Sequence, residues 1–255
     1  FWLKRAVPPA GARGRRPSRR RPRPMRSRSA GAEDRRLALR VPRTLWARGN
    51  AEICMVPDFL SDGEIAHLLD LASWERSTMR FVKYDGEGHL ESEEAPRHGA
   101  GRTSSTCTLR PAQDDRVISI ERRLARLANS EVACLEPLNL VRYEPGQFFR
   151  PHHDGGHRAK TVFLYLNDLP DGAGGETHFV KLDLKIPPRR GCAVVWSNLT
   201  PEGLRDERMW HQGLPPLDAT KYGMNAFFRS VPCRDSDSLA DDRPGPEACS
   251  AAPAS

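Results

Sequence analysis

The amino-acid sequence predicts an α+β domain in which short β-strands form a sandwich or barrel that helices cover on one side. Three observations support this fold class. Two amphipathic helical segments come first, within residues 59–73 and 114–128. At least five short runs rich in β-branched, aromatic and leucine residues follow Pro137. Turns that contain Gly, Pro and Asp separate these runs.

The first helix is expected to begin at Ser61. Glu64 follows three residues later, which is the pattern of a capping box. The apolar side chains then recur at helical spacing and form one buried stripe, made of Ile65, Leu68, Leu69 and Ala72. Residues 80–104 are rich in Gly, Glu, Ser and charge, and they are predicted to form a long loop.

The second helix is predicted over residues 114–128, with acidic residues at its start and arginines later, as the helix dipole favours. Its inward stripe comprises Val117, Ile120, Leu124 and Leu127. The predicted strands lie in "LNLVRY", "TVFLYLN", "ETHFVKL", "GCAVVWSN" and "YGMNAFFRSV". The expected organisation is a basic tail over residues 1–45, one domain over 46–234 and a polar, Pro-containing tail over 235–255.

Charge is distributed unevenly along the chain. Residues 1–30 contain ten Arg and one Lys without any acidic residue, so the net charge of +7 becomes about −4 when this segment is left out. Such a segment is typical of an arm for nucleic acid or a membrane surface, of an organelle transit peptide, or of a solvated tail. The folded part is therefore mildly acidic. No run of 18 apolar residues is present, so the sequence shown predicts no transmembrane helix.

The six cysteines contain no CxxC pair, which excludes a zinc-ribbon interpretation. One or two disulfides are possible, and the spacing does not identify which cysteines would pair.

The segment "RPHHDGGH" indicates a metal site. In a strand, residues two apart share a face, so His152 and Asp154 can chelate one ion. His211 is the natural third ligand. Two histidines and one carboxylate on one face of an octahedron leave three positions open, as in non-haem Fe(II) oxygenases. The alternative is a polar turn between two strands.

Lys221 opens the last predicted strand, where an inward ammonium needs a carboxylate partner. The alternative is a lysine whose side chain points to water.

Six segments of the sequence resemble the prolyl 4-hydroxylase family of Fe(II)/2-oxoglutarate dioxygenases, and most of all its short plant and algal type. They are "RTSSTCTL", "VISIERRLARL", "LNLVRYEPGQFFRPHHD", "TVFLYLNDLPDGAGGETHF", "GCAVVWSN" and "HQGLPPLDATKYGMNAFFR", and they occur in the family's order over roughly residues 51–231. The resemblance implies a double-stranded β-helix, or jelly-roll, core with supporting N-terminal helices.

The resemblance also implies the roles of individual residues. His152, Asp154 and His211 would bind Fe(II). The distal carboxylate of the cosubstrate 2-oxoglutarate would be bound by Tyr143, Thr177 and Lys221. Arg158 resembles a family position that lines the peptide site. O2 and ascorbate would be the further small molecules required. The other two histidines of the segment, His153 and His157, match no role and are expected to face solvent or to lie outside the metal's direct ligands.

Departures from the family pattern lie at the peptide-binding rim. The residues after the metal motif read "GGH" instead of the usual aromatic residues. The last strand has Tyr222, Ala226 and Phe227 where the family usually has Trp, a basic residue and Trp. The iron and cosubstrate positions match the family.

The implied function is hydroxylation of peptidyl proline to 4-hydroxyproline, with succinate and CO2 as co-products, and a proline-rich peptide suits it because its extended form is already ordered. One alternative is a dioxygenase for another residue, a small molecule or nucleic acid delivered by the basic arm. The other is a non-catalytic, metal-holding jelly roll. The resemblance implies the endoplasmic reticulum, whereas the Arg/Ser-rich segment would equally suit an organelle.

Overall fold

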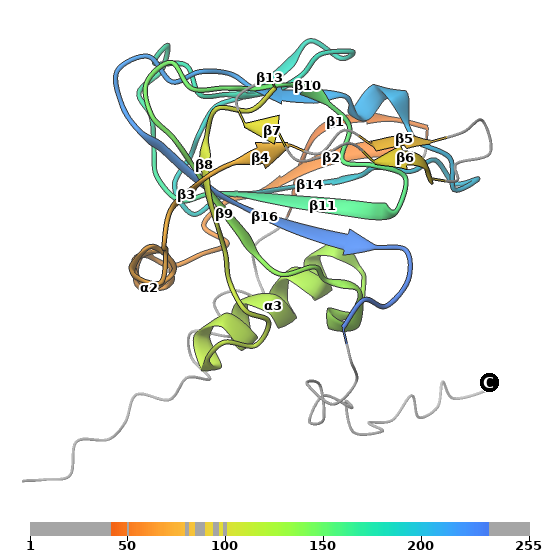
Figure 1. The fold of residues 1–255 in the computed structure, drawn as a ribbon, viewed down its shortest axis with the longest axis horizontal. Coiled ribbons are helices and arrows are strands. Elements are labelled where there is room, and N and C mark those ends of the chain that lie inside the picture. Colours follow the sequence, from red (N-terminus) through yellow and green to blue (C-terminus); the bar gives the residue numbers. More distant parts are fainter. Residues whose placement is uncertain are drawn as a thin grey trace, which may run out of the picture. The chain divides into compact units, whose positions relative to one another are not determined.

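Two antiparallel sheets form the centre of the computed structural model, which describes residues 42–49, 51–79, 82–84, 90–93, 97–98 and 101–234 (Figure 1). The large sheet has the order β1 (Arg43–Arg48), β2 (Ala51–Val56), β14 (Ala193–Ser197), β11 (Arg158–Tyr165), β16 (Lys221–Arg229), β9 (Asn139–Tyr143), β8 (Ser105–Thr108) and β3 (Glu75–Arg76). The small sheet has the order β10 (Phe149–His152), β15 (His211–Gly213), β12 (Thr177–Phe179) and β13 (Leu184–Ile186). The predicted jelly-roll class is confirmed.

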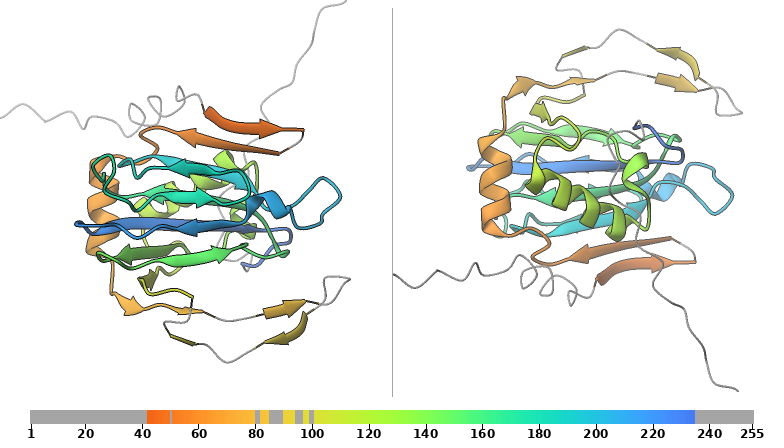
Figure 2. Two further views of the ribbon diagram at one scale, coloured as in Figure 1. Left: turned by 90° about the horizontal axis from the view of Figure 1, so that it is seen from above. Right: turned by 90° about the horizontal axis from the view of Figure 1, so that it is seen from below.

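Helices lie on the face of the large sheet opposite the small sheet, as Figure 2 shows from above and below. Helix α2 (Asp62–Asp70) begins with the predicted capping box between Ser61 and Glu64. Helix α3 (Asp115–Ala128) is capped by the Asp114 side chain, which accepts bonds from two backbone amides of the first turn. The predicted stripe of α3 is buried except for Leu127, which packs only partly against the core.

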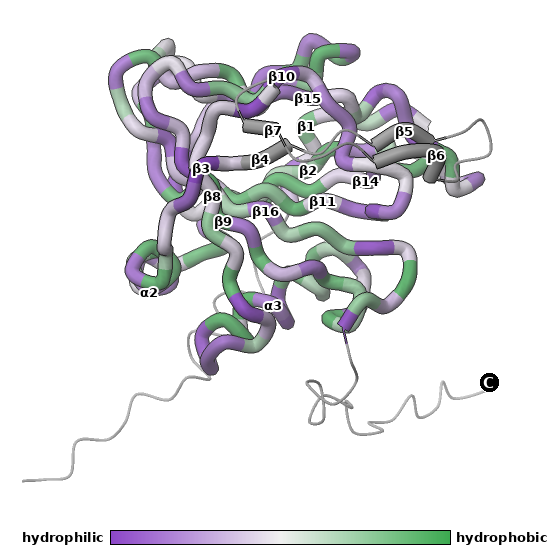
Figure 3. The backbone as a smooth tube through the Cα atoms, viewed as in Figure 1, coloured by the Kyte–Doolittle hydropathy of each residue, from purple (hydrophilic) through white to green (hydrophobic). Residues whose placement is uncertain are grey.

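The large sheet separates two hydrophobic cores, because alternate residues of a strand point to opposite faces. On β11, Val162 and Leu164 pack in the core beneath the helices, while Phe163 and Tyr165 pack in the core toward the small sheet. Met224 of β16 belongs to the helix-side core. In Figure 3 the hydrophobic colour follows these central strands.

The predicted loop over residues 80–104 contains strands that composition did not indicate. β4 (Thr78–Met79) pairs with β7 (Arg97–His98), and β5 (Val82–Tyr84) pairs with β6 (Leu90–Glu93). Strands of two to four residues are too short for an alternating pattern to be distinguished from a loop. β1 begins three residues before the expected domain start at residue 46, and the two predicted tails lie almost wholly outside the described residues.

Five of the six cysteines fall within the described residues, and these five are free thiols. Cys249 lies outside the described part of the chain. Of the helices described, none is long and apolar enough to cross a membrane.

Candidate metal and dicarboxylate site

The small sheet brings the three predicted metal ligands together. His152 ends β10 and His211 begins β15, and the antiparallel register places them directly opposite each other. Asp154 follows two residues after β10. Its Oδ1 lies 3.7 Å from Nε2 of His152 and 3.8 Å from Nε2 of His211. Ligand bonds of roughly 2.1 Å to one shared ion span such separations. The three residues could therefore hold one metal ion.

Backbone carbonyls orient both imidazoles. Nδ1 of His152 donates to the carbonyl of Arg150 at 2.8 Å, and Nδ1 of His211 donates to the carbonyl of Met209 at 2.8 Å. Each ring therefore keeps its Nε2 lone pair free to bind a metal. Burial, followed by the neighbouring His211, lowers the pKa of His152 to about 3, so this ring is neutral at physiological pH.

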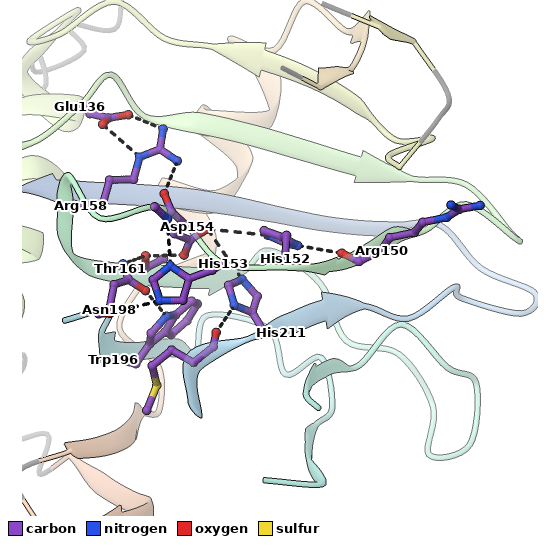
Figure 4. Close-up of polar contacts among 12 residues, drawn as sticks. Glu136, Arg150, His152, His153, Asp154, Arg158, Thr161, Trp196, Asn198 and His211 are labelled. Atoms are coloured by element: carbon purple, nitrogen blue, oxygen red, sulfur yellow. Dashed lines mark hydrogen bonds and ion pairs between the residues drawn. The ribbon is translucent and has the colours of Figure 1, made fainter. Parts of the chain in front are cut away.

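A chain of buried hydrogen bonds fixes the carboxylate (Figure 4). The Thr161 hydroxyl of β11 donates to Oδ2 of Asp154 at 2.6 Å, which leaves Oδ1 for the metal. The Asn198 amide donates to the Thr161 hydroxyl, and the indole of Trp196 donates to Oδ1 of Asn198. Burial alone would raise the pKa of Asp154, but both histidines, Arg158 and the Thr161 bond lower it below its usual value. The carboxylate is thus ionised and pre-oriented.

Replacing Thr161 by valine should weaken metal binding by about 10–100-fold, because the isosteric side chain cannot donate to Asp154. Calorimetric titration of the metal-free variant with Mn(II) measures this loss. Thr161→Ser, which keeps the hydroxyl, should restore most of the affinity. Equal affinities for the valine variant and the wild type would show that the hydroxyl does not orient the ligand.

A pocket opens beside the three residues, between the two sheets. Its wall is largely aromatic, and it also presents polar groups from both sheets. The lining residues used below are Arg102, Tyr143, Phe149, Phe163, Thr177, Trp196, Gln212, Lys221, Asn225 and Phe227. Lys221, the predicted cosubstrate residue, is only 1% exposed.

Lys221 is a buried cation without a matching anion. Within the described residues, no carboxylate lies within ion-pair distance of its Nζ, and the ring centres of Tyr143, Phe163 and Tyr165 lie 5.2–5.5 Å from Nζ. Burial lowers the pKa of Lys221 to about 7, and Glu176 only partly opposes this shift. An ammonium in such surroundings favours a bound carboxylate.

The other two predicted cosubstrate residues line the same pocket. Tyr143 pairs with Lys221 across β9 and β16, so both side chains share one face of the sheet. Thr177 of β12 lies on the opposite wall and is buried. Its Oγ1 lies 2.8 Å from the hydroxyl of Tyr165, a residue that sequence reasoning missed. The three predicted cosubstrate residues, Tyr143, Thr177 and Lys221, therefore line one pocket.

Glycines in "GAGGET" make this end of the pocket possible. Gly174 has φ +75° and Gly175 has φ +77°, a backbone region that other residues rarely adopt. A Cβ on Gly174 would lie 2.3 Å from the carbonyl oxygen of Pro215, and one on Gly175 would lie 2.6 Å from Leu169. Thr177, two residues after Gly175, lines the same pocket as Lys221.

Neither of the two extra histidines belongs to the three-residue cluster that could hold a metal. His153 lies 3.2 Å from the carbonyl of Asn198 and accepts the backbone amide of Gly155. The side chain of His157 is 39% exposed and lies 3.8 Å from Glu136. Both positions agree with the expectation that these rings are not direct ligands.

Arg158 is held by neighbouring residues at the edge of the site. Its guanidinium bonds to both carboxylate oxygens of Glu136, at 3.0 and 2.7 Å, and donates to the backbone carbonyl of Asp154 at 3.4 Å. It also lies 3.7 Å above the ring of Phe227, which lines the pocket. The expected contact of Arg158 with a peptide remains a prediction.

Arg102 and Phe149 are further pocket residues that sequence reasoning did not assign. The guanidinium of Arg102 lies 4.7 Å from the ring centre of Phe149, and that ring stacks on His152 with centres 3.6 Å apart. Nη2 of Arg102 is buried and has no hydrogen-bond partner among the described residues. Because these contacts join β10 to the segment before β8, sequence spacing alone could not reveal them.

Comparisons with known proteins agree with this geometry. A family profile described as the 2OG-Fe(II) oxygenase superfamily matches residues 138–229. Prolyl 4-hydroxylase 1 of Arabidopsis thaliana is 30% identical over 204 residues, which cover 69% of this chain and 68% of that protein. Probable prolyl 4-hydroxylase 7 of the same plant is 28% identical over 217 residues, which cover 74% of this chain.

Structural similarity extends over much of the chain. The viral collagen prolyl hydroxylase of Paramecium Bursaria Chlorella virus-1, solved as a 2OG complex, is 25% identical with a TM-score of 0.55. The match covers 70% of this chain and 96% of the viral one. The chain spans 65% and 66% of two curated plant relatives, probable prolyl 4-hydroxylases 7 and 6. By its sequence and its fold, the chain belongs to the prolyl 4-hydroxylase family of the 2OG-Fe(II) oxygenase superfamily.

Proposed function

We propose that the protein hydroxylates peptidyl proline to 4-hydroxyproline in a reaction that depends on Fe(II) and 2-oxoglutarate and yields succinate and CO2. One observation carries this proposal: two histidines and a carboxylate share a pocket with a buried lysine that lacks an ion-pair partner among the described residues. The membership of the protein in the prolyl 4-hydroxylase family supports the same conclusion.

The donor set fits Fe(II). His152, Asp154 and His211 would hold the ion, and three protein ligands leave open positions for a chelating cosubstrate and O2. When bound, the iron and 2-oxoglutarate activate O2 for insertion of oxygen into a C–H bond. The protein orients the ligands through Thr161 and the two backbone carbonyls. The aromatic residues that line the pocket would limit the access of water to the reacting atoms.

The far end of the pocket fits the distal carboxylate of 2-oxoglutarate. Lys221 would form a charge-assisted ion pair with it, and the hydroxyls of Tyr143 and Thr177 would donate hydrogen bonds. The buried ammonium would thereby gain the counter-charge that the described residues do not provide.

The affinity for 2-oxoglutarate should depend on pH because Lys221 titrates near pH 7 in the free protein. A bound carboxylate favours the ammonium and raises its pKa, so binding takes up a proton above pH 7. We expect full affinity at pH 6 and a fall of about tenfold per pH unit between pH 7.5 and 8.5. Calorimetry with Mn(II)-loaded protein measures the affinity for 2-oxoglutarate at each pH. The Lys221→Arg variant should show no such fall, because its guanidinium stays charged. A wild-type affinity that is constant over this range would contradict the assignment.

The proposed substrate is a proline-rich peptide. Phe149, Trp196 and Phe227 line the pocket beside the metal ligands, and aromatic faces suit the flat ring of proline. An extended polyproline segment is ordered before binding, so it loses little conformational entropy when it enters an aromatic groove. Relatives and a structural neighbour that carry the name prolyl hydroxylase support this substrate class.

The proposal is tested by incubating the protein with Fe(II), 2-oxoglutarate, ascorbate and a panel of proline-rich peptides. Each peptide has a matched control in which alanine replaces proline. We expect a mass gain of one oxygen on proline in at least one peptide and none in the alanine controls. Succinate release without peptide oxidation would retain the dioxygenase and reject this substrate class. Failure to release succinate, despite bound iron, would reject the enzyme.

Three further expectations remain predictions. A nucleic-acid partner would use the basic segment over residues 1–30, which lies outside the described residues. Residence in the endoplasmic reticulum and use of ascorbate are implied by family resemblance. Salt-dependent binding of RNA or DNA that is lost on deleting residues 1–30 would support the nucleic-acid role.

A further inference from the structure

The side-chain amide of Asn225 is a polar group of the pocket that has no role in the proposed reaction. Asn225 lies on β16, four residues after Lys221 and two before Phe227, and all three line the pocket. Within the described part of the chain, no hydrogen bond engages its amide. By contrast, the amide of Gln212, which also lines the pocket, donates to His178 at 2.9 Å.

Strand register places Asn225 toward the metal end of the pocket. Lys221 pairs with Tyr143 at the carboxylate-binding end. At the other end, Phe227 pairs with Thr161, whose hydroxyl holds Asp154. Asn225 is one same-face position from Phe227 and two from Lys221, because every second residue of a strand shares a face. Its amide therefore faces the space between the lysine and the metal ligands.

Gly223, the same-face residue between Lys221 and Asn225, leaves room for the ring of Phe163. A Cβ on Gly223 would lie 2.5 Å from the ring of Phe163, which pairs with Asn225 across β11 and β16. Apart from the Arg102 guanidinium, whose buried Nη2 has no hydrogen-bond partner among the described residues, the wall near Phe163 and Phe227 is aromatic, so a carboxylate oxygen that does not bind the metal would meet few other donors. A buried carboxylate oxygen without a donor is costly.

We propose that Asn225 is a further ligand-binding residue whose amide N–H donates to the metal-side carboxylate of 2-oxoglutarate. This inference rests on the proposed function, since it concerns the same cosubstrate. Lys221 would bind the distal carboxylate and Asn225 the proximal one, so the ligand is held at both ends and its keto acid is presented to the ion. A neutral amide suits this position because it donates a hydrogen bond without competing for the metal.

The test measures equilibrium binding of 2-oxoglutarate to Mn(II)-loaded protein by calorimetry, so it does not require turnover. Asn225→Leu keeps a side chain that branches at Cγ and removes its hydrogen bonding, and it should weaken binding by about tenfold or more. Asn225→Asp places a negative charge beside the carboxylate and should weaken it further. Mn(II) affinity in the absence of 2-oxoglutarate should stay unchanged in the leucine variant, because Asn225 is not a ligand of the ion.

A second ligand identifies which end of the acid Asn225 contacts. 2-Oxopentanoate keeps the keto acid and lacks the distal carboxylate. Asn225→Leu should weaken its binding by the same factor as that of 2-oxoglutarate, whereas Lys221→Met should affect 2-oxoglutarate much more. A loss confined to 2-oxoglutarate would overturn the assignment to the proximal carboxylate.

Asn139→Leu is the matched control. Asn139 pairs with Asn225 across β9 and β16, but its amide donates to the Thr108 hydroxyl at 3.0 Å and it does not line the pocket. This control should bind 2-oxoglutarate as the wild type does. Equal weakening in both leucine variants would mean that the effect is structural and would overturn the inference, as would wild-type affinity in Asn225→Leu. A wild-type protein that binds Mn(II) but no 2-oxoglutarate would overturn the proposed function as well.

Discussion

Asp154→Ala should lose metal binding and all 2-oxoglutarate-dependent succinate release. The reason is that Asp154 supplies the only carboxylate of the three-residue cluster and is within 4 Å of both histidines through one oxygen. Without it, two imidazoles remain, and a divalent ion loses its anionic ligand. We expect the Mn(II) affinity to fall by more than the roughly 10–100-fold that accompanies loss of an outer partner.

Two further variants separate this effect from a folding defect. Asp154→Asn keeps the shape of the side chain and can still accept the Thr161 hydrogen bond, yet it should show nearly the same loss of metal. Asp218→Ala, at an exposed aspartate, should bind Mn(II) as the wild type does. Tight Mn(II) binding by a folded Asp154→Ala protein would mean that the metal lies elsewhere.

Lys221→Met should raise the stability of the protein and at the same time remove its affinity for 2-oxoglutarate. The fully buried ammonium has a pKa near 7 instead of 10.5, which means that folding disfavours its charged form. One pKa unit corresponds to about 1.4 kcal/mol, so the apolar variant should gain on the order of a few kcal/mol near pH 7. Loss of the buried charge partner should weaken 2-oxoglutarate binding by at least about a hundredfold.

The pH dependence of stability gives an independent check. The folded-state pKa of Lys221 lies below its unfolded value, so the unfolded state binds more protons between pH 7 and about 10.5. Wild-type stability should therefore rise with pH over this window, and the methionine variant should lack this contribution. Urea unfolding at pH 7 and 9 measures the free energy of unfolding of both proteins. Lys181→Ala, a substitution of an exposed lysine, is the control. A methionine variant that binds 2-oxoglutarate normally would contradict the role of Lys221.

Local spacing predicted that His152 and Asp154 share one metal ion, whereas the cosubstrate roles of Tyr143, Thr177 and Lys221 came from the family resemblance. His152 and Asp154 are two residues apart, and the glycine-rich turn before Thr177 marks a sharp change of direction that only such residues allow. The capping box of α2 and the apolar stripe of α3 are local patterns as well, and both were predicted to within a few residues.

The remaining features depend on which strands become neighbours. Tyr165 reaches Thr177 from the other sheet, and Asn225 faces the pocket because β16 pairs with β11 in one particular register. A shift of one residue would turn every side chain of the strand to the opposite face. No spacing along the chain fixes that register. Short strands such as β15 escaped prediction because three residues cannot display an alternating pattern.

The central claim is that this pocket couples decarboxylation of 2-oxoglutarate to oxidation of a proline. The most direct test runs the reaction under 18O2 with a peptide that the protein binds, and determines the label in succinate and in the peptide by mass spectrometry. The account predicts one labelled atom in succinate and one in a new proline hydroxyl, in equal amounts and absent from Asp154→Ala. Hydroxylation with oxygen derived from water, or proline hydroxylation without stoichiometric succinate, would contradict it.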